Sequence, residues 1–356
     1  MAAACSRRRG GYRGYAFIAN EEGQGIAAID LETMAVARRI PLDGSPTQVL
    51  ASGTRPVIYA LTPDTGSVHE VQVYKLSSER KSAVAATAVS MALAADEKSM
   101  YLLARQPRAL ISVSTETLQA QSSIALPDDP TDFAVTVSGN FAAVTTPRGV
   151  WVADLTARSL RGPLAEGEFG AVQFRSDGKV VIAADLGQRR LSLFDTATGK
   201  LITHLPMAVR PDNLCIDQTG GQLFVTGDGM DAVVIVQPYQ TEVAGTVLAG
   251  RTPGPMAVSS SMLFVASPQS GNVSILDINS KKVIGVAQVG ADPGFVTVTP
   301  DNQYALVLNR KSGDVTVLRL SLSPSALVRE RNMWAVLTVI PVGSKPVSGA
   351  VAVRGA

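Results

Sequence analysis

Short apolar runs alternate with turn-forming residues along nearly the whole chain. Between residues 15 and 42, the runs YAFIAN, GIAAID and MAVARRIPL follow one another with short polar or glycine-bearing gaps. After the turn DGSP comes TQVLAS, a run of mostly small residues. Runs of this length bounded by turn residues are typical of β-strands, and helical periodicity is almost absent. The pattern therefore predicts an all-β fold.

The same unit of four runs recurs eight times. The residue that ends the first run returns every 39 to 43 positions, at Asn20, Thr62, Arg105, Thr146, Asp185, Asp228, Pro268 and Asn309. A period near forty residues with four short strands in each unit is typical of a β-propeller, in which each unit forms one blade of four antiparallel strands. We therefore expect an eight-bladed β-propeller. Seven blades is the alternative if the irregular second unit, residues 57–97, packs differently.

The two ends of the pattern predict how the ring closes. The repeat begins at Tyr15 with the second strand of a blade, and it ends with VSGAVAVRGA, residues 347–356, which has the character of an inner strand. Pairing these two segments completes the blade and removes exposed sheet edges. We expect residues 1–14 to form a flexible tail and residues 15–356 to form one propeller domain, because stacked repeats share their core.

Composition narrows the class of protein only a little. With 46% hydrophobic and 17% charged residues, the chain can form a packed core, and its net charge of +2 gives no reason to expect nucleic acid as a partner. No run of eighteen apolar residues occurs. The start, MAAACSRRR, resembles the end of a bacterial lipoprotein signal without its hydrophobic part. Lipidation of Cys5 is one expectation from this stretch, and an unstructured tail is the other.

Several units resemble the YVTN-type β-propeller repeat. They include YAFIAN with GIAAID, LFVTG with AVVIVQP, and LFVASPQSGNVSILDINSKKVIGVAQVG. In that repeat an aromatic-led strand ends in Asn or a similar residue, a turn with glycine follows, and the next strand ends in Asp. The resemblance covers residues 15–356, and it implies an architecture rather than a chemistry, because the matching positions serve packing and turns.

The resemblance also implies export and some functional alternatives. Proteins with this repeat are often exported bacterial or archaeal proteins of unassigned function, so we expect a periplasmic or cell-surface location. Many of them have seven blades. The eight-bladed haem d1 domain of nitrite reductases is similar, and sugar-lactone hydrolases use related propellers.

An aspartate ends the third strand of four units. These residues are Asp30, Asp154, Asp195 and Asp277. A short acidic side chain before a turn usually accepts hydrogen bonds from nearby backbone N–H groups. We expect a structural role at these positions rather than metal binding.

Ligands of propellers normally bind where two sets of loops meet at one end of the ring. Here the first set includes residues 20–25, 105–109, 185–190 and 228–231, and the second includes residues 250–255; we call the surface that both sets form the loop face. Arginine guanidinium groups on this face could bind the carboxylate or phosphate groups of a ligand, although neighbouring Asp and Glu side chains could form ion pairs with them instead. The candidate ligand-binding residues are Arg105, Arg148, Arg190, Arg210, Arg251, Arg310, Asp185 and Asp228.

Two catalytic or cofactor-dependent functions are the alternatives. A lactonase-like hydrolase would need converging carboxylates with a metal ion, for which location alone suggests Glu21, Asp64, Asp185, Asp228 and Asn309. A haem-binding propeller would need His69 or His204, the two histidines of the chain, as a ligand. The motifs HExxH, CxxC, CxxCH and GxSxG are absent from the sequence.

One long connection offers a second candidate contact surface. Residues 321–334 include Met333, Trp334 and the cluster Arg329 to Arg331, and they separate two strands that short turns join in other units. A self-packed surface loop is the simpler interpretation. Taken together, the sequence predicts a monomeric, non-catalytic binding or scaffold propeller without a cofactor or metal site. Its partner would be an unknown protein or a small anionic ligand, and it would contact a membrane only through a lipid on Cys5.

Overall fold

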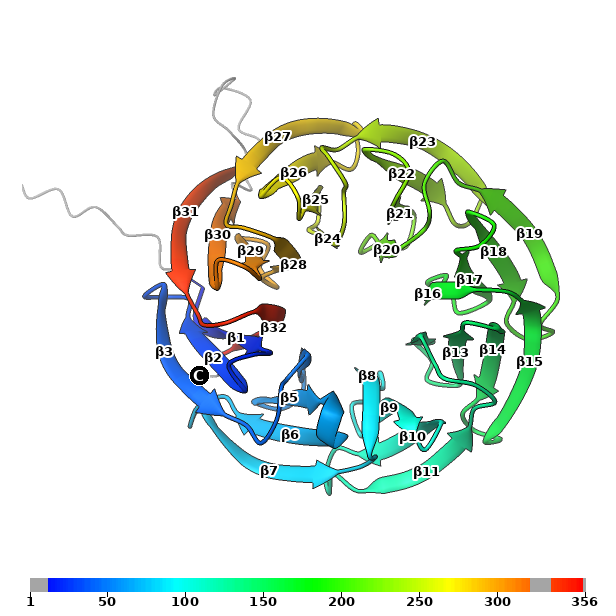
Figure 1. The fold of residues 1–356 in the computed structure, drawn as a ribbon, viewed down its shortest axis with the longest axis horizontal. Helices are drawn as coiled ribbons and strands as arrows, with labels where there is room; N and C mark the ends of the chain where they lie inside the picture. The colour runs from blue at the N-terminus through cyan, green and yellow to red at the C-terminus, as the bar shows by residue number, and fades with distance from the viewer. Residues whose placement is uncertain (1–11, 321–333, 355–356) are drawn as a thin grey trace, which may run out of the picture.

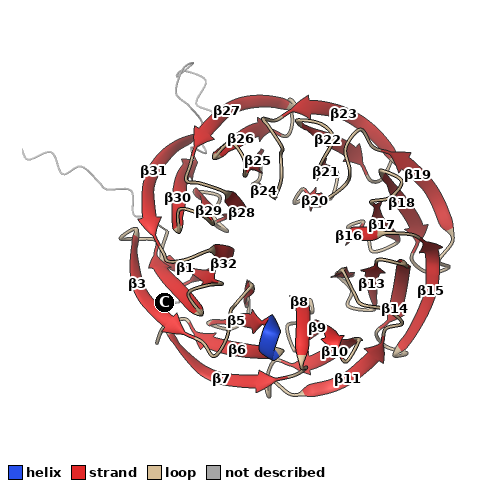
Figure 2. Ribbon diagram, in the orientation of Figure 1, coloured by secondary structure: helices blue, strands red, loops and turns tan. Residues whose placement is uncertain are grey.

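The chain forms a closed ring of eight β-sheets around one axis (Figures 1 and 2). The structure is a computed structural model that describes residues 12–320 and 334–354. From the axis outward, blade 1 consists of β32 (Pro346–Val353), β1 (Gly14–Asn20), β2 (Gly25–Asp30) and β3 (Ala35–Pro41). The other seven blades follow in chain order, each from its inner to its outer strand.

The bounds of these strands are as follows. Blade 2 contains β4 (Gln48–Ala51), β5 (Val57–Thr62), β6 (Ser67–Gln72) and β7 (Ser77–Ala83), with the short 3₁₀ helix η1 (Pro63–Thr65) between β5 and β6. Blade 3 contains β8 (Thr87–Leu93), β9 (Ser99–Gln106), β10 (Ala109–Ser114) and β11 (Ala120–Ala125). Blade 4 contains β12 (Asp132–Val135), β13 (Phe141–Thr146), β14 (Gly149–Asp154) and β15 (Ser159–Glu166). Blade 5 contains β16 (Phe169–Phe174), β17 (Val180–Asp185), β18 (Arg190–Asp195) and β19 (Leu201–Pro206).

The second half of the ring repeats this order. Blade 6 contains β20 (Asn213–Ile216), β21 (Leu223–Thr226), β22 (Ala232–Gln237) and β23 (Glu242–Leu248). Blade 7 contains β24 (Met256–Val258), β25 (Met262–Ser267), β26 (Asn272–Asp277) and β27 (Lys282–Gln288). Blade 8 contains β28 (Pro293–Val298), β29 (Tyr304–Asn309), β30 (Asp314–Leu320) and β31 (Trp334–Pro341).

The predicted blade count and ring closure are both confirmed. The second unit forms a regular blade, so the count is eight. Strand β32 pairs antiparallel with β1, with Phe17 opposite Ala350 and Gly14 opposite Val353. The last strand of the chain thus completes the first blade, and the ring closes through backbone hydrogen bonds.

The core lies between the blades and not within any one of them. Eight clusters of buried apolar side chains fill the eight spaces between neighbouring blades. Across the closing contact, Ile18 and Ile29 of blade 1 pack with Leu306 of blade 8. Every residue of β1 is buried, because a blade is covered on both faces. This explains why the second and third strands read as continuous apolar runs instead of alternating ones.

Polar side chains on the inner and second strands link neighbouring blades near the axis. Gln48 of β4 donates to the carbonyl of Met91 (3.0 Å) and accepts from its N–H (2.7 Å) in blade 3. Thr145 donates to Gly170 O (2.5 Å) between blades 4 and 5. Thr226 donates to Gly254 O (2.7 Å) between blades 6 and 7. These bonds satisfy backbone groups where inner strands approach closely.

Arginine side chains link the outer strands of some blades to the next blade. Arg38, Arg80 and Arg161 occupy the same register position in β3, β7 and β15. Each donates to a backbone carbonyl in a turn of the following blade: Lys75 O for Arg38, Thr115 O for Arg80, and Thr196 O for Arg161. The equivalent residue in blade 7 is Gly285. The indole of Trp334 from blade 8 packs against Gly285, in the space that a side chain at this position would occupy.

The aspartates that end the third strands play the structural role that the sequence predicts. Asp30 Oδ1 accepts from the N–H groups of Glu32 and Thr33. Asp154, Asp195 and Asp277 accept from backbone N–H groups two or three residues further on in the same way. Each therefore fixes the turn that leads into an outer strand.

Among the described residues, no helix has the length and apolar character needed to cross a membrane.

The ion pairs of Glu70 yield a prediction about stability. Glu70 is only 2% exposed, and its Oε2 lies 2.5 Å from Arg80 Nη2 and 3.1 Å from Arg55 Nη2. We expect Arg80→Ala to lower the free energy of unfolding by about 2–4 kcal/mol, because a buried carboxylate loses a charged partner.

Urea unfolding of the full chain measures this effect. The matched control is Arg38→Ala, whose bond to Lys75 O is exposed and 3.5 Å long, and it should change stability by no more than about 0.5 kcal/mol. Equal effects of the two substitutions would contradict the importance of Glu70 burial.

Candidate functional site

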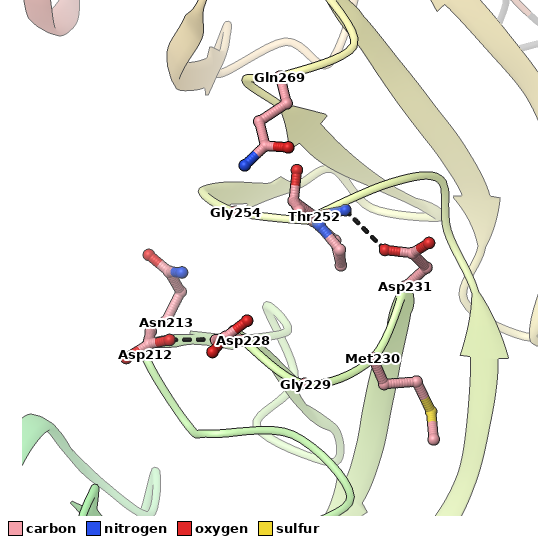
Figure 3. A pocket seen from close by; sticks show the side chains of 11 residues that line it. Asp212, Asn213, Asp228, Gly229, Met230, Asp231, Thr252, Gly254 and Gln269 are labelled. Atoms are coloured by element: carbon pink, nitrogen blue, oxygen red, sulfur yellow. Dashed lines mark hydrogen bonds between the residues drawn. The ribbon is translucent and has the colours of Figure 1, made fainter.

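The loop face carries a cavity of about 620 Å³ between blades 6 and 7 (Figure 3). The β21–β22 loop, the connection from β23 to β24 and the β25–β26 loop supply most of its lining. The lining residues are Asp212, Asn213, Gly227, Asp228, Gly229, Met230, Asp231, Thr252, Pro253, Gly254 and Gln269. A volume of this size is in the range that small-molecule sites occupy.

Two carboxylates and two glycines shape the walls of this cavity. Asp231 Oδ1 accepts from the N–H of Thr252 at 2.8 Å, and Asp212 Oδ2 accepts from the N–H of Asp228 at 3.0 Å (Figure 3). A side chain at Gly227 would collide with the carbonyl of Arg210, and Gly229 has a φ of +111°. The path of the loop therefore requires glycine at positions 227 and 229.

The remaining polar groups of the cavity have few partners. Asn213 stands at the inner-strand register position that Gln48 holds in blade 2 and Asp132 holds in blade 4. Those two residues bond to the next blade, whereas the described part of the chain offers the Asn213 amide no hydrogen bond. In Figure 3 the side chains of Asn213 and Gln269 extend into the open space from opposite sides.

The cavity offers mainly hydrogen-bond acceptors with negative charge. Arg210 Nη1 lies 3.2 Å from Asp212 Oδ1 and partly compensates that carboxylate from outside the cavity. For the carboxylate of Asp228, no ion pair or side-chain hydrogen bond is found within residues 12–320 and 334–354. The side chain of Met230 is 40% exposed and adds an apolar surface. Such a lining suits a small ligand that donates hydrogen bonds.

A second cavity of about 380 Å³ lies on the loop face between blades 2 and 3. Arg105 and Asp64 are among its lining residues, together with Arg108, which forms an ion pair with Asp129 at 2.6 Å. This cavity thus presents guanidinium groups. It lies across the ring from the first cavity (Figure 1).

The eight candidate residues are spread over several blades and connections, and only Asp185 and Arg190 among them form an ion pair with each other. Asp228 lines the first cavity and Arg105 lines the second. Four of the arginines form ion pairs with nearby acids, namely Arg148 with Asp128, Arg190 with Asp185, Arg210 with Asp212, and Arg310 with Asp292. For Arg251, the described ranges contain no ion pair. Ion pairing thus occupies a large part of the anion-binding capacity of this face.

Both histidines have partners away from the inner strands. His69 of β6 is buried, with Nε2 2.8 Å from Asp43 Oδ1, and burial lowers its pKa. His204 of the outer strand β19 has Nδ1 3.0 Å from Ser192 Oγ, and desolvation followed by the charge of Arg190 lowers its pKa. A haem ligand drawn from either histidine would have to give up these contacts.

The residues considered for a hydrolase also lie apart. Glu21 forms an ion pair with Lys345, Asp185 with Arg190, and the Asn309 amide donates to Asp314 and Thr316. Within the described ranges, no group of three or more His, Cys, Asp or Glu side chains is arranged to hold a metal ion.

Cys5 and residues 321–333 of the long connection lie outside the described residues. Trp334 alone represents that connection, and it packs on Gly285 of blade 7 as the first residue of β31.

Asn213, Thr252 and Gln269 are site residues that the sequence analysis missed. Their amide and hydroxyl groups carry no charge and fit no motif, so location is the only signal. Asn213 could have been found by aligning the inner strands, because it stands where Gln48 and Asp132 stand.

The fold and the site define the chain as an eight-bladed β-propeller with cavities on its loop face. No family model matches the sequence. The chain is similar to the seven-bladed beta-propeller protein Rv1057 of Mycobacterium tuberculosis, with 24% identity over 141 residues. That match spans 38% of this chain and 36% of the relative, so it covers only about a third of either protein. It supports membership of the β-propellers at large.

Solved structures show the same fold. The dihydro-heme d1 dehydrogenase NirN, solved in complex with DHE, has a TM-score of 0.77 at 11% identity, covering 98% of this chain and 77% of that chain. Hydrazine synthase of Kuenenia stuttgartiensis has a TM-score of 0.62 at 17% identity, covering 78% of this chain and 96% of that chain. A functionally unknown protein from Desulfotomaculum acetoxidans has a TM-score of 0.61 at 13% identity, covering 78% and 97%. At these identities the likeness is one of fold.

The inner-strand carboxylate Asp132 yields a pH-dependent prediction. Its Oδ2 accepts from the N–H of Val172 at 3.0 Å, and burial raises its pKa to about 6. An unfolded aspartate has a pKa near 3.9, so the folded state binds this proton more tightly. The contribution of Asp132 to stability is therefore present at low pH and is lost as the pH rises through about 6.

We expect Asp132→Asn to raise the free energy of unfolding by about 1–2 kcal/mol at neutral pH and above, with little gain near pH 4. The amide oxygen can still accept from Val172, as the amide of Gln48 does from Met91. Denaturant unfolding across this pH range measures the gain. Asp195→Asn is the control, because that exposed carboxylate accepts backbone bonds and its pKa is lowered by its bonds to Thr198. A loss of stability in Asp132→Asn at neutral pH would contradict this account.

Proposed function

We propose that the protein is a non-catalytic binding propeller that holds a small polar ligand on its loop face, in the cavity between blades 6 and 7. The observation that carries the proposal is the 620 Å³ cavity itself, with Asn213 and Asp228 presenting polar groups to it. Asn213 supports the proposal further, because the equivalent residues in blades 2 and 4 bond to the next blade. The Asn213 side chain lines the cavity and has no such structural hydrogen bond within the described residues, so it is available to a ligand.

The chemistry of the lining favours a ligand that donates hydrogen bonds. None of the eleven lining residues of the cavity is Lys or Arg, and three are aspartates. Amine and hydroxyl groups are therefore preferred over phosphate or carboxylate groups at this position. The second cavity, with Arg105, is the place where a small anion would bind.

The proposal includes the repeat type and the location of the protein. Asn20 and Asn309 end the second strands of their blades, as the YVTN-type repeat has it, and we propose that the chain is a propeller of that type. The start of the sequence supports export and a lipid on Cys5 as part of the same proposal.

The experiment is a thermal-shift screen of the full chain against amines, polyols, sugars and small carboxylates. We expect amines or polyols to raise the melting temperature of the wild type, and we expect Asn213→Ala combined with Asp228→Ala to abolish that shift. The matched control is Asp64→Ala combined with Arg105→Ala in the second cavity, which should leave the shift intact. Calorimetric titration of the best compound then gives the loss of affinity, expected to be at least about tenfold.

Other outcomes of the same screen would overturn the proposal. A shift by carboxylates that is lost only in the Arg105 variant would move the site to the second cavity. Hydrolysis of a lactone that depends on an added divalent ion would support a hydrolase, and a Soret band that appears on addition of haem would support a cofactor-binding propeller.

A further inference from the structure

The outer strands of the ring divide into a polar half and an apolar half. In each four-stranded blade the outer strand has one partner, so its second edge is unpaired within the described residues. Figure 1 shows these strands around the circumference, with β3, β7, β11 and β15 on one side and β19, β23, β27 and β31 on the other. We call the first set the polar rim and the second set the apolar rim.

The two rims differ in the side chains that they expose. The apolar rim carries ten exposed large apolar side chains, namely Leu201, Ile202, Val243, Leu248, Val283, Ile284, Val286, Val336, Leu337 and Val339. The strands of the polar rim, all of which the structure describes, carry none. Seven charged residues lie on the polar rim, and only Glu242 and Lys282 lie on the apolar rim.

The difference holds at equivalent positions of the repeat. Ile284 in β27 corresponds in register to Leu337 in β31, and both correspond to Glu79 in β7. Val286 corresponds to Val339 and to Lys81. Charged side chains on an edge strand, lysine above all, keep it from pairing with another chain. Blade 2 thus has charged residues at these two positions of its edge strand, whereas blades 7 and 8 have aliphatic residues there.

We propose that β27 and β31 form the interface of a symmetric dimer with a second copy of this chain. These two strands are neighbours in the ring, and each exposes three large aliphatic side chains. An exposed apolar surface of this kind marks an interaction site. This proposed dimer differs from the monomer that the sequence analysis expects.

Strand direction makes this rim complementary to itself. The outer strands all run the same way around the ring (Figure 1). When a second ring lies beside the first, related by a two-fold axis parallel to the ring axis, strands that face each other run antiparallel. Strand β27 of one copy then faces β31 of the other, and their free edges and apolar side chains are in position to pair.

Charge also favours a second copy. Strand β31 has no charged residue, so Lys282 at the start of β27 meets no like charge in this arrangement. The same contact through β3 and β7 of the polar rim would instead place the five charged residues of those two strands at the interface. A lipid surface fits less well, because membrane-binding faces carry several Lys or Arg residues beside the apolar ones, and Lys282 is the one such residue within strands β19, β23, β27 and β31.

Sedimentation velocity of the full chain from about 1 to 100 µM tests the dimer, because moderate interfaces dissociate within this range. We expect a species of twice the chain mass of 37.2 kDa at the upper end. Ile284→Glu combined with Val286→Lys places the residues of blade 2 into blade 7 and should give a monomer. Leu337→Glu combined with Val339→Lys should do the same from β31.

The matched control is Gln121→Glu combined with Ser123→Lys at the equivalent positions of β11, which should remain dimeric. Circular dichroism and the melting temperature show that each variant is folded. A wild type that stays monomeric at the highest concentration would overturn the proposal, and so would a folded Ile284 and Val286 double variant that still dimerises. If the β11 control dissociates as well, the interface is not at the apolar rim.

Discussion

No blade of this protein can cover its own apolar faces, and the rest of the structure depends on that constraint. The second and third strands are apolar on both faces, so each blade needs a neighbour on each side. An open array would leave two blades with one face in water, at a cost of about 25 cal/mol for each Å² of apolar surface. Closure through β32 and β1 removes both exposed faces at once.

The need to pack against neighbouring blades acts differently on the inner strands near the axis and on the outer strands at the circumference. Near the axis, inner strands approach closely, and side chains such as Gln48 and Thr145 bond to the backbone of the next blade. At the circumference, outer strands contact each other less, and long side chains such as Arg80, Arg161 and Trp334 reach the next blade. Residues on the inner strands are therefore constrained by the blade beside them, whereas residues on the outer strands can vary in chemistry while the ring stays intact.

This separation explains what the sequence could and could not predict. The period of the apolar runs sets the blade count, and the segment at 347–356 indicates closure, because both depend on local pattern and on burial. The turn role of Asp30 and Asp277 is predictable for the same reason, since their partners are two or three residues away. The cavity is not predictable, because Asn213 and Gln269 meet only after blades 6 and 7 pack side by side. The ion pairing of Arg148 and Arg310 likewise depends on loop paths that no repeat position fixes.

The same logic lets the loop face and the rim evolve independently within one ring. The turn that carries Asp228 and Gly229 leaves the ends of β21 and β22, while Ile284 and Val286 lie on β27 at the circumference. A substitution on either surface leaves the eight buried clusters unchanged, because none of these four residues belongs to a cluster. Each blade can thus acquire its own loop chemistry and its own edge chemistry at little cost to the core. The half-polar rim and the acidic cavity between blades 6 and 7 are what such independent variation among eight similar blades produces.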